Sequence, residues 1–301
     1  MSAKTIIVTG ASRGKHHTTQ SHAPAPTSNW TRNKNANILH QYILGIGLSI
    51  TKYLLTAPQA HNVVVVARSV EPLRKLKEQY GKQVEVLNGD LADFSLASKA
   101  VKLATDTYGR LDGMVLNHGV LGQVGKVEEA DFEQWKHGFD INFISLVAFV
   151  KAGLPALRES KGKIIFTSSG AAVSAYRGWG LYGSSKAAMN HLALSLGEEQ
   201  PDVTSVSIRP GMVDTEMQRE LREDHATTLE PQVHFKFMTV HKDGKLLKPE
   251  QPGHVMAKLV LDAPSTLTGK FLSWVLRLYR QEKTKLTTTR WNDKELEAFQ
   301  E

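Results

Sequence analysis

Short apolar runs rich in β-branched residues alternate along this chain with segments in which apolar residues recur at helical spacing. The runs are typical of strands buried on both faces of a parallel sheet, and they lie at residues 5–9, 62–67, 83–88, 111–116, 163–167, 202–208 and 269–273. Helices are expected at residues 48–55, 94–108, 131–153 and 252–261, and from near residue 181. The alternation predicts an α/β fold, and the length of 301 residues suits one large domain.

The composition bears on where the protein acts. No stretch holds 18 consecutive apolar residues, and the N-terminal residues run directly into the first expected strand without a signal-peptide pattern. Cysteine is absent, which excludes disulfides and thiolate metal sites and is compatible with a reducing compartment. We therefore expect a cytoplasmic protein with no membrane segment and no metal site.

The net charge of +7 favours a nucleic-acid partner at first sight. Its distribution argues against one. Residues 15–45 carry three of the excess positive charges and residues 275–291 carry the other four, so the rest of the chain is neutral. Because both segments are unusual in other respects, we expect no nucleic-acid surface.

One stretch, residues 167–186, carries the candidate chemistry. Tyr182 and Lys186 stand four apart, so a helix beginning near residue 181 places both on one face. A free tyrosine has a pKa of about 10, and a nearby lysine cation lowers that pKa, which suits the phenol for proton transfer to a carbonyl. Ser169, at the end of an apolar run, can donate a hydrogen bond to the same substrate oxygen. Taken alone, the pattern also fits an amphipathic helix that happens to contain both residues.

Further motifs occur in a fixed order along the chain. They are Thr9-Gly-Ala-Ser-Arg-Gly14, Asn88-Gly-Asp-Leu91, Asn117-His-Gly119, Asn142 and Arg209-Pro-Gly-Met-Val-Asp-Thr215. Together with Ser169, Tyr182 and Lys186, this set resembles the short-chain dehydrogenases/reductases, a Rossmann-type family of NAD(P)(H) oxidoreductases. The resemblance covers most of the chain and is strongest to the branch of yeast-type benzil reductases and sepiapterin-reductase-like proteins.

The resemblance implies a single domain with a doubly wound, seven-stranded parallel sheet, helices on both faces and the cofactor at the carboxyl ends of the strands. Its implied catalytic residues are Asn142, Ser169, Tyr182 and Lys186, with the asparagine holding a water that relays protons to the lysine. The implied cofactor-binding residues are Gly10, Ser12, Arg13, Gly14, Ile46, Gly47, Arg68, Asp90, Leu91, Asn117, Gly119, Tyr182, Lys186, Pro210, Val213 and Thr215. His118 departs from the alanine that is usual in the family, and we expect it to serve local packing.

The phosphate loop of the family is interrupted in this chain. It begins correctly from Gly10 through Gly14 and resumes at Gly45-Ile-Gly47. The intervening residues are rich in Asn, His, Thr and Pro, and a long irregular insertion is improbable in so tight a loop. Since splice-donor and splice-acceptor codons can be written at both ends, we interpret residues 15–45 as a translated intron, with a genuine surface loop as the alternative. Residues 275–291, basic and rich in Thr and Lys, are a second candidate insertion.

Two arginines bear on the choice of cofactor. An NAD site would hold the ribose 2′-hydroxyl with Asp or Glu after the second strand, but this chain has Ala67-Arg68-Ser69, and Arg13 lies in the glycine loop. A guanidinium presents a planar fork to phosphate oxygens. The pair therefore favours NADP(H), whose ribose carries a 2′-phosphate.

The sequence thus predicts an NADPH-dependent oxidoreductase that reduces a ketone or 1,2-dicarbonyl to the alcohol, with Tyr182 as proton donor. The alternative is an NADP-binding protein whose catalysis is impaired or absent because the phosphate loop is split. The polar stretch 217–250 is either a substrate lid, as in relatives, or a plain surface excursion. Relatives commonly dimerise through the long helix that contains Asn142 and the helix that carries Tyr182, so we expect a homodimer or homotetramer.

Overall fold

A seven-stranded parallel sheet forms the centre of the molecule. The computed structural model describes residues 2–10, 45–56, 58 and 60–273. The strand order is β3-β2-β1-β4-β5-β6-β7, and every neighbouring pair is parallel. The strands are β1 (Thr5–Thr9), β2 (Asn62–Ala67), β3 (Val84–Asn88), β4 (Gly113–Leu116), β5 (Lys163–Thr167), β6 (Thr204–Arg209) and β7 (Phe271–Ser273). The predicted doubly wound parallel fold is confirmed.

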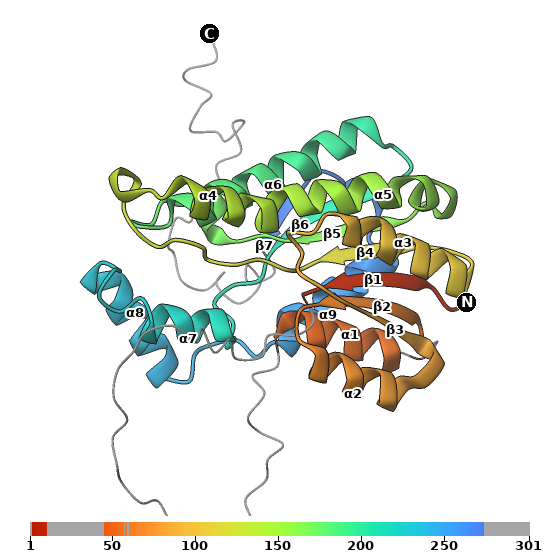
Figure 1. Cartoon of the computed structure of the whole chain (residues 1–301), viewed down its shortest axis with the longest axis horizontal. Coiled ribbons are helices and arrows are strands. Elements are labelled where there is room, and N and C mark those ends of the chain that lie inside the picture. Colours follow the sequence, from red (N-terminus) through yellow and green to blue (C-terminus); the bar gives the residue numbers. More distant parts are fainter. Residues whose placement is uncertain (1, 11–44, 57, 59, 274–301) are drawn as a thin grey trace, which may run out of the picture.

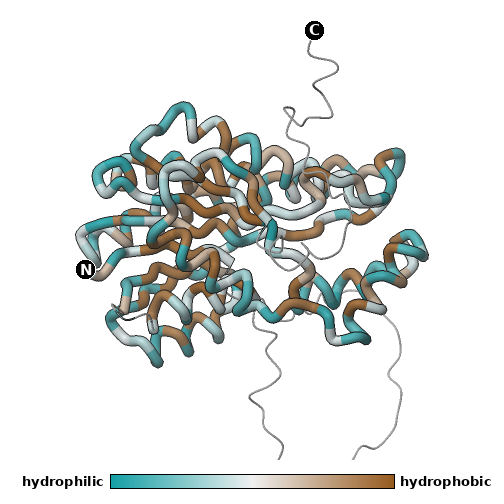
Figure 2. The backbone as a smooth tube through the Cα atoms, turned by 180° about the vertical axis from the view of Figure 1, so that it is seen from behind, coloured by the Kyte–Doolittle hydropathy of each residue, from teal (hydrophilic) through white to brown (hydrophobic). Residues whose placement is uncertain are grey.

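Helices cover both faces of this sheet, as Figure 1 shows. On one face lie α1 (Ile46–Thr56), α2 (Val70–Tyr80) and α9 (Glu250–Asp262). On the other lie α3 (Ser95–Tyr108), α5 (Ser145–Ser160) and α6 (Gly180–Glu199), with α4 (Phe132–Phe139) leading into α5. Each face has its own apolar core, and the five inner strands between them, β2, β1, β4, β5 and β6, are buried almost completely, whereas the edge strands β3 and β7 are mostly half-buried. Figure 2 shows the hydrophobic residues concentrated in these central strands and the polar residues at the outer turns.

The chain order reverses between β1 and β4, the two strands at the middle of the sheet. β1 pairs with β2 on one side and with β4 on the other. In an open parallel sheet, such a switch point leaves a crevice outside the carboxyl ends of the strands, where ligands bind. The topology therefore places any small-molecule site at the edge where Gly10 and Asn117 follow their strands.

A pair of helices stands beside this carboxyl edge and is called the lid below. It consists of α7 (Glu216–Glu223) and α8 (Pro231–Lys242), which project from the body of the domain in Figure 1. Leu221, Leu229 and Phe237 of this region form a third apolar cluster with Trp179 and Tyr182. The sequence left two interpretations for residues 217–250, a lid or a plain surface excursion. Since these contacts tie α7 and α8 to the start of α6, the stretch packs as a cover over the carboxyl edge.

The helix from Phe132 to Ser160 is interrupted by a π-helical turn at Asp140–Ile144. Among the described residues it is the one helix whose length and hydropathy, with a mean of 1.4 in its apolar window, match those of a membrane span. Its side chains Leu146, Phe149 and Leu157 belong to the core on the sheet. A core helix of this kind meets the same two criteria, and 44% of that window is buried inside the domain.

The bounds of the expected strands and helices agree with the structure to within two residues, except that the helix expected at 131–153 continues to Ser160. Helices α2, α7 and α8 are not among those expected from the sequence. Gly109, which follows the helix expected at 94–108, adopts the left-handed conformation with φ of 74°. Just ahead of β4, the backbone N–H and the carboxylate of Asp112 both bond to the backbone of Thr5. The two suspected insertions, 15–45 and 275–291, lie outside the described residues apart from Gly45, and their interpretation stays a prediction.

Candidate active site

Two neighbouring cavities open at the carboxyl edge of the sheet. The larger has a volume of about 490 Å³ and lies between the sheet, α6 and the lid. The smaller, of about 50 Å³, lies at the ends of β2 and β3. Gly10, Asn117 and Gly119 line both cavities. The two cavities therefore form one trough across the switch point.

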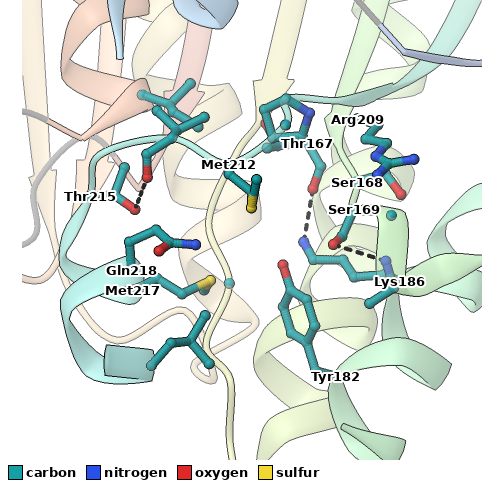
Figure 3. Close-up of a pocket in the computed structure, with 18 of the residues that line it drawn as sticks. Thr167, Ser168, Ser169, Tyr182, Lys186, Arg209, Met212, Thr215, Met217 and Gln218 are labelled. Carbon is teal, nitrogen blue, oxygen red and sulfur yellow. Dashed lines mark hydrogen bonds between the residues drawn. The ribbon is translucent and has the colours of Figure 1, made fainter. Parts of the chain in front are cut away.

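Helix α6 supplies two side chains to the larger cavity. Tyr182 and Lys186 lie one turn apart in its first half, so they share the face that packs on the sheet. Lys186 is buried, and its Nζ donates to the carbonyl oxygen of Thr167 at 2.8 Å. The same Nζ lies 5.7 Å from the centre of the Tyr182 ring. Figure 3 shows the ammonium group and the phenol oxygen pointing into the same space.

Ser169 reaches this space from the end of β5. It caps a short 3₁₀ turn at Gly170–Ala172, and its Oγ accepts a hydrogen bond from the backbone N–H of Ala171 at 3.2 Å. Accepting this bond leaves the hydroxyl hydrogen available as a donor. Ser169 and Tyr182 thus line one cavity from two different elements, with Lys186 beside them.

Asn142 lies behind these side chains and does not line either cavity. It is completely buried within the π-helical turn, a local structure that is frequent at functional sites. Its Oδ1 accepts from the N–H of Val120 at 2.8 Å, while its Nδ2 donates to the oxygen of Val120 and to Oγ of Ser185. The amide therefore joins the loop after β4 to α6, one residue before Lys186.

Two glycines keep the trough open. Gly10 has φ of 71°, and a Cβ there would lie 2.8 Å from the Cα of His118. A Cβ on Gly119 would lie 3.2 Å from Nζ of Lys186 and 3.3 Å from Oδ1 of Asn142. Side chains at these positions would fill space that a dinucleotide needs, because its pyrophosphate approaches the backbone closely.

The features expected of a dinucleotide site meet along this trough. Gly45 and Ile46, at the start of α1, line the larger cavity, so the positive end of a helix faces it. Arg68, Asp90 and Leu91 line the smaller one, where the adenosine part is expected. The described residues fit a bound nicotinamide dinucleotide.

The structure brings most of the predicted site residues together. Those that line one or both cavities are Gly10, Ile46, Arg68, Asp90, Leu91, Asn117, Gly119, Ser169, Tyr182, Lys186, Pro210, Val213 and Thr215. Gly47 is buried in the first turn of α1 and lines neither cavity. Ser12, Arg13 and Gly14 lie outside the described residues. The part that each residue plays in binding or catalysis stays a prediction.

His118 is buried, as its expected role in packing requires. Its Nδ1 lies 2.6 Å from Oγ1 of Thr9, and its Nε2 lies 2.7 Å from Oγ of Ser145. That serine donates its own hydrogen to the oxygen of Ile141, so Nε2 of the histidine is the donor to it. The ring therefore links β1 to the start of α5 beneath the trough.

Sequence reasoning missed the wall of the larger cavity that faces the sheet. Trp179 stacks on Phe237 with ring centres 6.0 Å apart and meets Tyr182 edge-on at 5.8 Å. Met217 and Gln218 of α7 complete this wall. Within the stretch 217–250, Phe237 is buried here, whereas Phe235 is 71% exposed. No local pattern distinguishes them, because burial depends on how α8 packs.

No three His, Asp or Glu side chains within the described ranges are grouped in a way that could hold a metal ion. The polar groups of the site are the hydroxyls of Ser169 and Tyr182, the ammonium group of Lys186 and the amide of Asn142 behind them.

Comparison with known proteins identifies the family. The sequence profile of the short chain dehydrogenases matches residues 43–226. An uncharacterized oxidoreductase of Saccharomyces cerevisiae is 39% identical over 232 residues, which cover 76% of this chain and 91% of the relative. Its crystal structure, that of a short-chain dehydrogenase/reductase, gives a TM-score of 0.78 at 33% identity and covers 99% of both chains.

Two named relatives agree. Benzil reductase ((S)-benzoin forming) of S. cerevisiae is 38% identical over 241 residues, covering 76% of this chain and 92% of that protein. Sepiapterin reductase of Mus musculus is 30% identical over 218 residues, covering 67% and 82%. The chain belongs to the short-chain dehydrogenase/reductase family of oxidoreductases, and the predicted resemblance is confirmed.

Proposed function

We propose that this protein is an NADPH-dependent carbonyl reductase that converts a ketone or 1,2-dicarbonyl to the corresponding alcohol. The observation that carries the proposal is the meeting of Ser169, Tyr182 and Lys186 in one cavity at the switch point. The similarity to a benzil reductase supports a carbonyl substrate. The alternative, a cofactor-binding protein without catalysis, is not favoured, because the named relatives are reductases.

In the proposed reaction, a bound nicotinamide cofactor supplies the hydride to the carbonyl carbon. Tyr182 gives its phenolic proton to the carbonyl oxygen, which becomes the hydroxyl of the product. Ser169 donates its hydroxyl hydrogen to the same oxygen and stabilises the negative charge that develops there. Both groups line the cavity, and the serine hydroxyl is available because its oxygen already accepts from Ala171.

Lys186 and Asn142 support that proton transfer. The buried ammonium group of Lys186 favours the phenolate that Tyr182 becomes, and it can also hold the cofactor ribose. Asn142 ties the loop of Gly119 to Ser185, the residue before the lysine. We propose that it orders a proton relay to the lysine.

Support for NADPH over NADH comes from the end of β2. Arg68 lines the smaller cavity beside Asp90 and Leu91. A guanidinium there suits the 2′-phosphate of NADP(H), and the two residues directly after β2, Arg68 and Ser69, include no carboxylate to hold a 2′-hydroxyl. Arg13, in the glycine loop, supplies a second positive charge in the sequence.

We further propose that the protein is cytoplasmic and acts as a homodimer or homotetramer without nucleic-acid or membrane partners. The lack of cysteine supports the location. Three apolar side chains are 37–51% exposed: Ile144 at the end of the π-helical turn, Val147 on α5 and Leu194 on α6. They support association through these helices, which light scattering would test.

The proposal is tested by Tyr182→Phe. This change removes the proton donor and keeps the ring, so NADPH-dependent reduction of benzil should fall by about 10²–10⁴-fold. NADPH affinity, measured by titration calorimetry, should stay within about twofold. Tyr53→Phe is the control, because Tyr53 lies on α1 outside both cavities and should keep full activity. Activity of the Tyr182 variant within about twofold of wild type would refute the assignment.

A further inference from the structure

The lid wall of the larger cavity combines apolar and polar side chains. Met217, Leu221, Val233 and Phe237 line it and belong to the third apolar cluster or pack against it. The polar residues of α7 and α8 that line the same cavity are Glu216, Gln218, Gln232 and Lys236. Among these four Gln218 is the buried one, with 7% of its surface exposed. A few placed polar groups in an apolar pocket orient a ligand and determine its specificity.

A second buried polar side chain determines which way the Gln218 amide points. Arg222 lies one turn further along α7 and is 8% exposed. Its Nη1 donates to Oε1 of Gln218 at 3.4 Å. A guanidinium has donors and no acceptor, so the amide oxygen must face Arg222. The amide nitrogen, Nε2, is thereby directed into the cavity, and Figure 3 shows it facing the side that carries Tyr182 and Lys186.

Both groups lack the partners that burial usually brings. Among the described residues, Nε2 of Gln218 donates no hydrogen bond, and Arg222 forms no ion pair with a carboxylate. By contrast Arg219, on another face of the same helix, pairs with three carboxylates. An amide nitrogen that is held toward a cavity and has no acceptor among the described residues is placed to donate to an acceptor on a ligand.

We propose that Gln218 is a specificity-determining residue that donates from Nε2 to a second oxygen of the substrate. The first oxygen belongs to the carbonyl that is reduced and faces Tyr182 from the other side of the cavity. The site therefore prefers a 1,2-dicarbonyl to a monoketone of the same skeleton, and Arg222 is the positioning residue for the amide. The inference rests on the proposed carbonyl-reductase function.

The test compares benzil with deoxybenzoin, which keeps both rings and lacks the second carbonyl oxygen. The two ketones also differ in intrinsic reactivity, because the second carbonyl of benzil activates the first toward hydride, so the readout is the change in the ratio of their kcat/KM values between proteins. Gln218→Glu is nearly isosteric and presents a carboxylate that accepts and does not donate, so the benzil-to-deoxybenzoin ratio should fall about tenfold from its wild-type value, the factor that one hydrogen bond supplies. The kcat/KM for deoxybenzoin should change less than that for benzil. A variant that is merely misfolded would lower kcat/KM for both ketones by the same factor.

Arg222 is tested by two variants. Arg222→Met releases the amide oxygen and should reduce the preference for benzil, whereas Arg222→Lys supplies another donor and should restore most of it. If the Met variant keeps the full preference, Arg222 has no positioning role. Since the readout is a ratio between two substrates, it is independent of the fraction of active protein.

Binding in the presence of NADP⁺ gives a second readout, through quenching of tryptophan fluorescence, because Trp179 lies in the cavity wall. The two dissociation constants should differ by about tenfold in the wild type and should become similar in Gln218→Glu. A benzil-to-deoxybenzoin ratio that Gln218→Glu leaves unchanged would overturn the inference. The inference would also fail if Gln218→Glu weakened NADPH binding and lowered kcat/KM for both ketones equally, because the Gln218 amide would then contact the cofactor and not the substrate. If the wild type reduces neither ketone, the proposed function fails, while the binding ratio still decides the role of Gln218.

Discussion

The two edges of the sheet use buried polar groups in opposite ways. At the amino edge, the carboxylate of Asp112 accepts from the backbone of Thr5 and from Arg110, and His61 accepts from the backbone of Lys4. These groups bind to one another and to the ends of strands. At the carboxyl edge, the hydroxyl of Ser169 and the amide of Gln218 keep a donor directed at a cavity.

This difference separates stability from function within one sheet. A polar group that is satisfied inside the protein contributes to folding, whereas a donor held for a ligand costs stability until the ligand arrives. Substitutions at the amino edge should therefore alter the free energy of unfolding and leave the chemistry of folded molecules unchanged. Substitutions of Ser169 and Gln218 at the carboxyl edge should do the reverse, because each keeps a donor directed at the cavity.

The largest expected effect concerns the split phosphate loop. Deleting residues 15–45 joins Gly14 to Ile46 and restores the Thr-Gly-x-x-x-Gly-x-Gly motif ahead of α1. Its backbone donors and the helix N-terminus then converge on one pyrophosphate, so NADPH should bind about 100-fold more tightly, the value of one or two charge-assisted hydrogen bonds. Titration calorimetry on the two proteins measures the ratio. Equal affinities would mean that the insertion is a tolerated surface loop.

A smaller effect at the same edge is expected from Arg68→Asp. A carboxylate repels the 2′-phosphate of NADPH and can accept from the 2′-hydroxyl of NADH. NADPH affinity should fall about tenfold relative to NADH. Lys52→Asp is a control on α1 with the same charge change, and Lys52 lines neither cavity. A wild-type protein that already prefers NADH would contradict the interpretation of Arg68.

At the amino edge, Asp112→Ala should lower the free energy of unfolding by about 1–3 kcal/mol, because the N–H of Thr5 loses its buried acceptor. Urea unfolding measures this, and kcat per folded molecule should not change. Asp243→Ala is the control, since Asp243 pairs only with the exposed Lys245 among the described residues and should cost less than about 0.5 kcal/mol. A loss of kcat per folded molecule in Asp112→Ala would contradict the expectation that the amino edge affects stability alone.

The smallest effect is a pH dependence at His61. Burial, and next the charge of Lys4, lower the pKa of this histidine below its value of about 6.5 in an unfolded chain. The unfolded state therefore binds the proton more readily, so the stability of the fold is greatest above about pH 6.5 and falls as the pH drops below it. Urea unfolding at about pH 7.5 and about pH 5.5 should show the loss, and His61→Gln should reduce it. A stability that rises on acidification would contradict this sign.

Much of the fold and part of the site follow from local sequence. Apolar runs rich in β-branched residues, such as 62–67, favour buried strands, and the four-residue spacing of Tyr182 and Lys186 places both on one face once the segment is helical. The ordered motifs of the family gave the switch point and the glycines of the trough. These features depend on the period of a helix or strand and on backbone conformation, which short stretches encode.

The lid and its chemistry were decided only by tertiary structure. Gln218 and Arg222 read as an ordinary polar helix, and Phe235 and Phe237 are equivalent residues in sequence. Which of them faces the cavity depends on how α7 and α8 pack against Trp179 and Tyr182 of a distant segment. The sequence therefore determined the sheet and the helix turn that carries Tyr182 and Lys186, whereas long-range packing determined the lid wall of the cavity. The physical reason is that a side chain's neighbours across a cavity come from chain segments that no local period relates.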